Sequence, residues 1–184
     1  MLIAVLFARK DSPYKTFPDF DVWDVDRDAR TFFEKMPVIA HPPCRAWGQL
    51  SQMANHVEGE KQLAFLALAQ VRLNGGILEH PLRSKLWNEA SLPIDDEIDL
   101  FGGYTIVIDQ WHFGHVARKP TNLYIVGVPR EKLPSLPHRH GLPRKTICGI
   151  NGQPGRRCTQ YEREYTPTNL ILWLRKVALM VGTR

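Results

Sequence analysis

A cysteine follows two prolines directly after a short apolar run, in the segment PVIAHPPCRAWG at residues 37–48. The thiolate form of cysteine is a strong nucleophile, and Arg45 places a cation beside Cys44 that would favour this form. Pro42 and Pro43 restrict the backbone, so the thiol is positioned before a substrate arrives. The segment predicts a nucleophile at the end of a buried strand, and a small apolar cysteine that only packs in the core is the alternative.

A carboxyl group follows a second apolar run, in the segment GGILEHP at residues 75–81. Glu79 ends this run beside His80 and Pro81. A carboxyl group there can hydrogen-bond a ring nitrogen, especially if burial raises its pKa and keeps it protonated. The alternative is an acid that closes the strand by capping or by ion pairing.

An aromatic and basic segment, QWHFGHVARKPTNLYIVG, spans residues 110–127. Trp111 and His112 are rings that can stack on a nucleobase. Arg118 and Lys119 can bind a phosphate or a carbonyl oxygen. Ordinary core aromatics beside a solvated basic edge are the alternative interpretation.

The elements that position these residues follow from the apolar runs and the residues that end them. Residues 2–8 are continuously apolar, which is typical of a strand buried on both faces. Helix formers with a helical apolar spacing occupy 58–73, and two glycines follow soon after. Further elements are expected as strands at 37–40, 76–81, 103–110 and 121–128, and as a closing helix with Thr166 as its N-cap and Pro167 as its first residue.

This order of elements predicts an α/β fold in a single domain over residues 1–184, with a Rossmann-like three-layer sandwich around a mostly parallel sheet. Functional groups in such sheets gather at the carboxyl ends of the strands. Arg9, the segment 41–44 and the segment 79–81 each follow an apolar run directly. We therefore expect three strands to present polar residues at one edge of the sheet.

Composition narrows the class of protein. The chain of 184 residues has a formal net charge of +5 and a pI near 9.2, which favours anionic partners such as DNA or nucleotide phosphates. No run approaches the roughly 18 apolar residues of a membrane span, and three cysteines do not suggest a disulfide framework. We expect a soluble cytoplasmic protein with no membrane partner.

Residues 129–165 are rich in proline, glycine and basic side chains and show no sustained apolar period. Such a stretch is typical of a functional loop, so we expect a basic loop or lid here. It also holds four residues of types that bind zinc: His138, His140, Cys148 and Cys158. Because no Cys-x-x-Cys pair is present, the basic loop is preferred and no metal site is expected.

Three of these segments, in this order, resemble motifs of the DNA cytosine-C5 methyltransferases. VIAHPPCRAWG resembles the strand and Pro-Cys loop of that family, and GGILEHP is similar to its Glu-Asn-Val segment. FGHVARKPTNLYIVG resembles the segment that leads through Gln-x-Arg-x-Arg into an apolar strand, and VWDVDRDART resembles the acidic second strand. The resemblance covers about residues 20–127 and extends to small phage-encoded proteins, for which the cytoplasm would be that of the host.

The resemblance implies a transferase that modifies a pyrimidine base in DNA. Cys44 would attack C6 of the ring, and Glu79 would hydrogen-bond or protonate N3. Action on duplex DNA would require the base to be flipped out of the stack. Arg45 is grouped with these two catalytic residues, and the residues expected to bind the substrate are Arg9, Ser12, Tyr14, Lys15, His41, Pro43, His80, Trp111, His112, Arg118, Lys119 and Thr121.

The chain departs from the family at the loop after its first strand. The family has a glycine-rich motif there that binds S-adenosylmethionine, whereas this chain reads FARKDSPYK at residues 7–15, with residue types that bind phosphate. The cofactor therefore remains open, either S-adenosylmethionine or none. Without it, thiolate addition at C6 could expel a phosphate from an activated 5-hydroxymethyl group, as in phage thymine hypermodification. The two other functions considered are a non-catalytic nucleic-acid-binding or inhibitor protein and an enzyme of free pyrimidine nucleotides.

Overall fold

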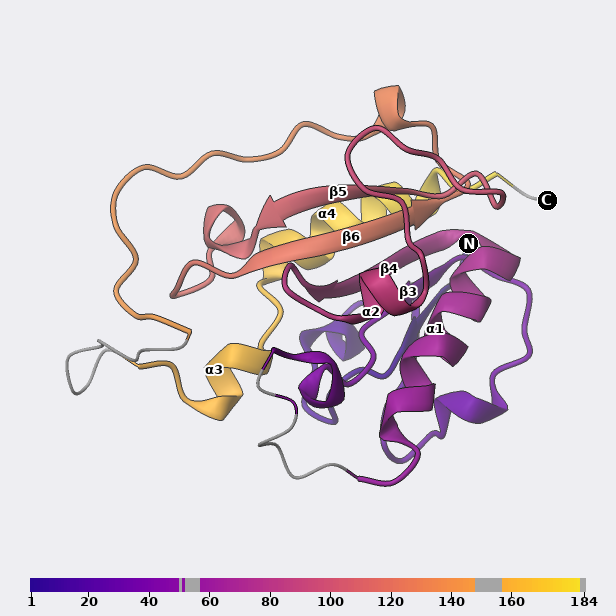
Figure 1. The fold of residues 1–184 in the computed structure, drawn as a ribbon, viewed down its shortest axis with the longest axis horizontal. Coiled ribbons are helices and arrows are strands. Elements are labelled where there is room, and N and C mark those ends of the chain that lie inside the picture. The colour runs from indigo at the N-terminus through magenta and orange to yellow at the C-terminus, as the bar shows by residue number, and fades with distance from the viewer. Residues whose placement is uncertain (50, 52–56, 148–156, 183–184) are drawn as a thin grey trace.

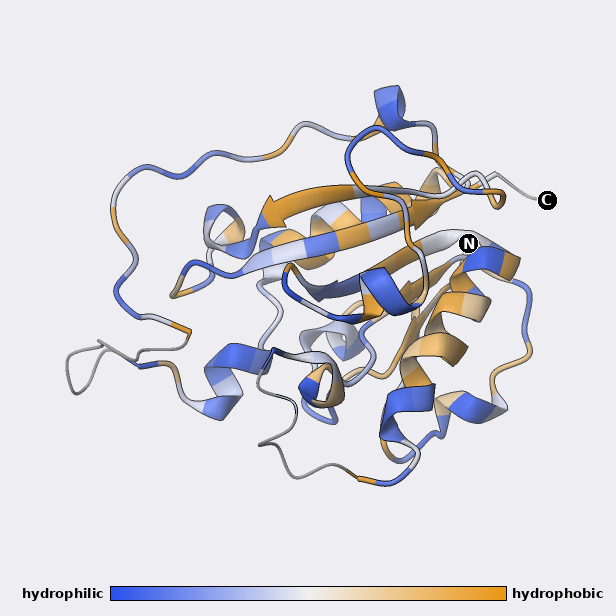
Figure 2. Ribbon diagram, viewed as in Figure 1, coloured by the Kyte–Doolittle hydropathy of each residue, from blue (hydrophilic) through white to orange (hydrophobic). Residues whose placement is uncertain are grey.

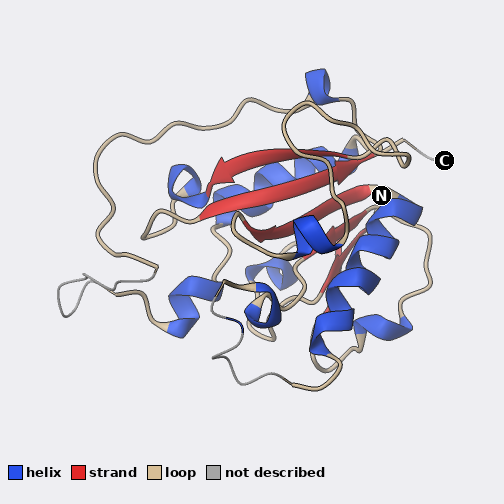
Figure 3. Cartoon of the chain, viewed as in Figure 1, coloured by secondary structure: helices blue, strands red, loops and turns tan. Residues whose placement is uncertain are grey.

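The computed structural model of the chain describes residues 1–49, 51, 57–147 and 157–182. Its centre is a mixed sheet with the strand order β2-β1-β3-β4-β6-β5 (Figure 3). β2, β1, β3 and β4 are parallel neighbours, while β6 pairs antiparallel with both β4 and β5. The strands are β1 at Ile3–Leu6, β2 at Phe20–Trp23, β3 at Val38–Ala40, β4 at Gly76–Pro81, β5 at Tyr104–Asp109 and β6 at Pro120–Val126.

Helices cover both faces of this sheet (Figure 1). The α-helices are α1 at Glu60–Asn74, α2 at Leu86–Glu89, α3 at Gln160–Glu164 and α4 at Thr168–Leu179. Short 3-10 helices are η1 at Pro13–Thr16, η2 at Ala29–Thr31, η3 at Arg45–Trp47, η5 at Gln110–Phe113 and η6 at Arg130–Lys132. The prediction of an α/β fold with a mostly parallel sheet is therefore confirmed.

The central strands read as continuous apolar runs because each face of the sheet packs against its own helix. Ile77 of β4 belongs to the core cluster on the α4 face, and the next residue, Leu78, belongs to the cluster on the α1 face. Apolar residues accordingly line α1, α4 and the strands between them (Figure 2). Alternate side chains of a strand point to opposite faces, so both sets must be apolar.

Two glycines set the entry to β4, the strand that carries Glu79. Gly75 has φ +74° and Gly76 has φ +131°, backbone conformations that side chains rarely allow. A Cβ atom on Gly76 would lie 1.9 Å from the carbonyl oxygen of Val38. The close approach of β4 to β3 therefore requires glycine at this point.

The closing helix and the basic segment differ from the expected pattern in detail. Pro167 rather than Thr166 is the N-cap of α4, because the backbone of Pro167 is still extended and the helix begins at Thr168. Residues 133–147 form no helix or strand and include only isolated bridge residues, at Lys145 and Thr146. They connect η6 to the part of the chain that leads into α3, and whether the segment moves as a lid stays a prediction. Each helix in the described residues is too short or too polar to cross a membrane.

Candidate active site

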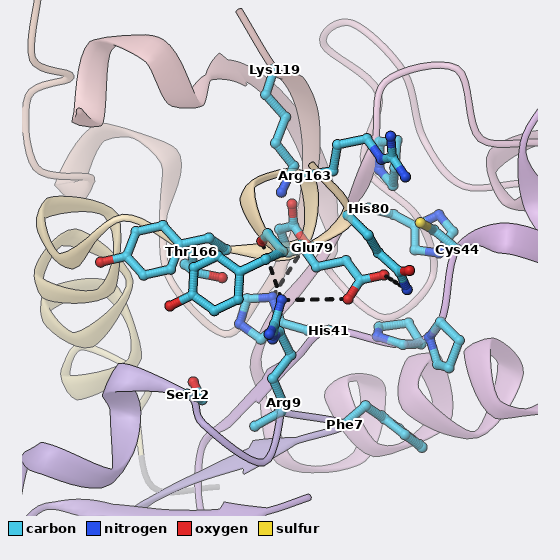
Figure 4. Close-up of a pocket in the computed structure, with 18 of the residues that line it drawn as sticks. Phe7, Arg9, Ser12, His41, Cys44, Glu79, His80, Lys119, Arg163 and Thr166 are labelled. Atoms are coloured by element: carbon cyan, nitrogen blue, oxygen red, sulfur yellow. Dashed lines mark hydrogen bonds and ion pairs between the residues drawn. The ribbon is translucent and has the colours of Figure 1, made fainter. Parts of the chain in front are cut away.

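A cavity of about 860 Å³ lies at the carboxyl ends of β1, β3 and β4 (Figure 4). The strand order reverses here, because β2 lies on one side of β1 while β3 and β4 extend on the other. Open α/β sheets bind ligands in the crevice at such a reversal, and this volume is within the usual range for small-molecule sites. The cavity walls are the loops after these three strands, the loop that enters β6, and α3 with the residues after it.

Most of the predicted site residues meet at this cavity. Eleven of the fifteen line it: Arg9, Ser12, Tyr14, His41, Pro43, Cys44, Arg45, Glu79, His80, Arg118 and Lys119. They come together because β1, β3 and β4 are parallel, so the residues after each strand arrive at the same edge. Lys119 arrives there from the opposite direction, because β6 is antiparallel and begins at that edge.

Four predicted residues do not reach the cavity. Lys15 pairs with Asp24 at 2.5 Å. Trp111 is buried in the protein, and the ring of His112 stacks on a neighbouring histidine beside a second, smaller cavity. Thr121 is buried and supports another side chain, as described below.

Cys44 presents a free, exposed thiol to the cavity. The protein atoms around the thiol raise its pKa, the carboxylate of Glu79 raises it further, and the ammonium group of Lys119 partly offsets this. Arg45 does not supply the cation, because its guanidinium pairs with Glu60 of α1 at 3.0 Å. The prediction that the cation of Arg45 favours the thiolate was wrong, and the thiol of the free protein is protonated at neutral pH.

Glu79 is an ionised carboxylate, although the sequence suggested a protonated acid. Burial opposes ionisation, but the ammonium group of Lys119 and a hydrogen bond from His41 outweigh it and lower the pKa of Glu79 to about 2. Lys119 extends toward Glu79 in Figure 4. Nδ1 of His41 lies 3.2 Å from Oε2 of the carboxylate, and Nε2 of Gln110 donates to Oε1 at 2.7 Å. The condition considered for Glu79 in the sequence, that burial raises its pKa and keeps it protonated, is therefore not met.

The basic loop after β1 is neutralised by carboxylates, one from the same loop and two from the segment that follows β2. Arg9 donates to both oxygens of Asp11, at 2.9 and 3.1 Å, and Lys10 pairs with Asp26 at 2.8 Å. Since Lys15 is paired as well, these cations are engaged and do not present the free phosphate site that the sequence suggested.

Cationic side chains that line the cavity without a carboxylate partner, as far as the structure describes the chain, come from elsewhere. They are Lys119, before β6, and Arg163 of α3. Among the described residues, the guanidinium of Arg163 donates to the carbonyl oxygen of Cys158, at 3.3 Å. An anionic group of a ligand would find its best partners at this pair of side chains.

Sequence reasoning missed the wall that α3 provides. Tyr161 and Tyr165 line the cavity, and the guanidinium of Arg9 lies 4.4 Å from the ring centroid of Tyr161. α3 begins with a capping box in which Thr159 and Glu162 hydrogen-bond each other's backbone. The Thr-x-x-Glu spacing could have predicted this helix, but only the fold brings it to the cavity.

His80 is a neutral, buried imidazole beside the cavity. Neither ring nitrogen makes a hydrogen bond of ordinary geometry within the described residues, and the ring stacks on Trp87 with a centroid separation of 6.5 Å. Burial lowers the pKa of His80 to about 4, although the charge of Glu79 and the backbone of Pro43 act in the opposite direction. The side chain is therefore uncharged at neutral pH.

This buried histidine predicts a loss of stability in mild acid. Its pKa is about 6.5 in the unfolded chain and about 4 in the folded one, so the unfolded state binds the extra proton as the pH falls between these values. The free energy of unfolding should fall by roughly 2 kcal/mol between pH 7 and pH 5, above the range in which Glu79 titrates. Urea denaturation at both pH values measures it.

A variant isolates the contribution of His80. His80→Phe keeps a ring against Trp87 but cannot bind a proton, so its stability should vary much less between these pH values. A variant with the full acid dependence of the wild type would contradict the assignment.

No metal centre is evident in the described part of the chain. There, no group of three or more His, Cys, Asp or Glu side chains is arranged to hold a metal ion. His138 stacks against His112 at 4.9 Å and contacts His140 at 4.8 Å, while Cys148 lies outside the described residues.

Comparisons with known proteins do not assign this site. The chain matches no protein-family model, and no curated protein sequence matches it. The function proposed below rests on the cavity and on the chemistry of the side chains that line it.

Proposed function

We propose that the protein is an enzyme that modifies a pyrimidine base in DNA, through a covalent bond between Sγ of Cys44 and C6 of the ring. One observation carries the proposal: an exposed thiol and an ionised, buried carboxylate line the same cavity at the carboxyl edge of the sheet. A thiol supplies the nucleophile, and a fixed carboxylate can hold a polar edge of a flat heterocycle.

The proposed reaction proceeds by addition and elimination. The thiol loses its proton to solvent, and its sulfur forms a bond to C6 while the electrons of the C5=C6 double bond move to C5 and the C4 carbonyl. C5 then forms a bond to the transferred group of an electrophilic donor, and the donor's leaving group departs with the electrons of the bond that breaks. Loss of the proton from C5 and departure of the thiolate restore the ring. Lys119 assists the first step, because its charge lowers the pKa of Cys44.

The architecture supports a second proposal, that the fold is Rossmann-like. The sheet reverses its strand order between β1 and β3, and its two faces pack against α1 and α4, which gives three layers. A reversal with helices on both faces is typical of doubly wound nucleotide-binding folds.

S-adenosylmethionine fits the loop after β1 poorly. Residues 7–15 contain no glycine that would let the backbone approach a ligand closely. Ser12 instead caps η1 through its side chain, and the guanidinium of Arg9 is held between Asp11 and the carbonyl oxygen of Tyr161. The chemical identity of the donor that supplies the transferred group to C5 is therefore left unassigned.

A non-catalytic pyrimidine-binding protein is the second candidate. The observation that favours it is the raised pKa of Cys44, which keeps the thiol protonated at neutral pH. In that case the cavity and the cationic side chains of Lys119 and Arg163 would bind a nucleotide without chemistry.

Mass spectrometry of nucleosides tests the proposal. DNA and free nucleotides from cells that express the protein should be digested and compared with those from cells that express Cys44→Ala. We expect a new pyrimidine nucleoside in the DNA that depends on Cys44. A new species in the free pool alone would make the enzyme one of free nucleotides, and unchanged nucleosides in both pools would favour the non-catalytic candidate.

A further inference from the structure

We propose that Glu79 selects a pyrimidine that carries a hydrogen on N3, which means a ring of the uracil or thymine type, over cytosine. This inference rests on the proposed function, because it assumes that a pyrimidine ring occupies the cavity. Of the two roles that the resemblance implies for Glu79, it keeps the hydrogen bond to N3, with Glu79 as the acceptor, and excludes protonation of N3 by Glu79.

The hydrogen bonds on one side of Glu79 fix it as an acceptor. The hydroxyl of Thr121 has a single hydrogen, which it donates to the carbonyl oxygen of Lys119 at 2.9 Å. The same hydroxyl oxygen lies 3.1 Å from the nearest polar atom of the Gln110 side chain. Because its own hydrogen is already used, the oxygen must accept a hydrogen bond from Gln110, so the atom of Gln110 that faces it is the amide nitrogen. That nitrogen also lies 2.7 Å from Oε1 of Glu79 and donates its other hydrogen to the carboxylate.

The hydrogen bonds on the other side act in the same direction. Tyr14 is fully buried, and burial raises the pKa of its hydroxyl well above the ordinary value, so the hydroxyl keeps its proton. The hydroxyl lies 3.0 Å from Nε2 of His41 and can donate its hydrogen to that nitrogen. Because an ionised carboxylate can only accept, Nδ1 of His41 carries a hydrogen and donates it to Oε2 of Glu79 at 3.2 Å. Both carboxylate oxygens therefore already receive a hydrogen bond.

The carboxylate keeps acceptor capacity for a ligand. Each oxygen of an ionised carboxyl group has about two lone-pair sites, and among the described residues each oxygen of Glu79 uses one of them. The side chain is 12% exposed and lines the cavity. It can therefore accept a hydrogen bond from a ligand, but it has no hydrogen to donate.

This restriction separates the pyrimidines. Uracil and thymine carry a hydrogen on N3 and can donate it, whereas N3 of cytosine is itself an acceptor. Two acceptors facing each other in a buried site leave both without a partner, which weakens binding. The amino group of cytosine offers a hydrogen only if the ring shifts. N3 lies opposite C6 across the ring, and the amino carbon C4 lies opposite N1, so the shift would move C6 away from the sulfur of Cys44.

Calorimetric titration tests the selection without requiring turnover. The probes are dUMP, dTMP and dCMP, together with short single-stranded oligodeoxyadenylates that hold one central deoxyuridine, thymidine or deoxycytidine. The wild-type protein should bind the uracil and thymine probes at least about tenfold more tightly than the cytosine probe. The two kinds of probe also show whether the ring is recognised in a free nucleotide or in a strand.

Two variants locate the selection at Glu79. The amide of Glu79→Gln can turn its hydrogens toward N3 of cytosine, so the preference should vanish or reverse. Glu164→Gln is the matched control, because Glu164 is another cavity carboxylate, which accepts side-chain hydrogen bonds from Arg9 and Gln160, and the variant should keep the wild-type preference.

Cytosine binding as tight as uracil, or a preference that Glu79→Gln leaves unchanged, would overturn the inference and leave the proposed attack by Cys44 standing. A failure of every pyrimidine probe to bind the wild-type protein would overturn both.

Discussion

Replacement of Cys44 by serine is expected to reduce base modification by about a thousandfold or more, with little change in binding. A hydroxyl is a much weaker nucleophile than a thiol, and no second cysteine is among the described residues that line the cavity. Serine is close to cysteine in size and occupies an exposed position, so the fold should be unaffected. The yield of modified nucleoside measures the first effect, and titration with an oligonucleotide measures the second.

Cys158→Ala is the matched control, because this cysteine is buried away from the cavity lining. Modification should continue at the wild-type rate in any preparation that folds. Wild-type activity in Cys44→Ser would remove the proposed mechanism, whereas a loss of binding that matches the loss of activity would reduce Cys44 to a binding residue.

Replacement of Glu79 by glutamine is expected to have opposite effects on activity and on thiol reactivity. Modification should fall about a hundredfold or more, because the carboxylate that holds the ring is lost. The alkylation rate of Cys44 by iodoacetamide at pH 8 should rise, because the charge of Glu79 raises the pKa of the thiol and its removal lowers that pKa. General unfolding would instead make the buried Cys158 reactive as well, which peptide mapping distinguishes.

Lys119→Gln is expected to change the reactivity of the Cys44 thiol in the opposite direction. The ammonium group of Lys119 lowers the pKa of Cys44, so its removal should slow alkylation at the same pH. If both variants changed the alkylation rate in the same direction, the electrostatic account of the cavity would be contradicted.

The sequence predicted the edge of the sheet that carries the site, because the signals there are local. Apolar runs identified β1, β3 and β4, and the prolines and polar residues after them marked the strand ends. Since parallel strands end at a common edge, Cys44 and Glu79 could be expected to share a cavity before the structure was known.

The charge states of the site could not be predicted in this way, because they depend on contacts between distant segments. Arg45 is next to Cys44 in the chain, yet its partner is Glu60, which α1 brings close. Glu79 is ionised because Lys119 and His41, each about forty residues away in the sequence, surround it in the fold. Proximity along the chain was a poor guide to electrostatic environment.

The sequence did not predict the residues that support the site, for the same reason. Gln110 follows β5 as an ordinary polar residue, and only the antiparallel pairing of β5 with β6 places it against Thr121 and Glu79. α3 belongs to a basic segment without apolar periodicity, so its part in the cavity wall had no signal beyond its capping box.

The most direct test of the central claim is exchange of the hydrogen on C5 of the pyrimidine. Addition of the thiolate to C6 makes C5 basic, so C5 takes a hydrogen from solvent, and reversal of the addition can release the original one. This exchange needs no donor of the transferred group. An oligonucleotide with one deoxyuridine, incubated with the protein in deuterated water and examined by NMR, should lose its C5 proton signal with the wild-type protein and keep it with Cys44→Ser. Retention of the signal with a wild-type protein that binds the oligonucleotide would contradict covalent attack by Cys44.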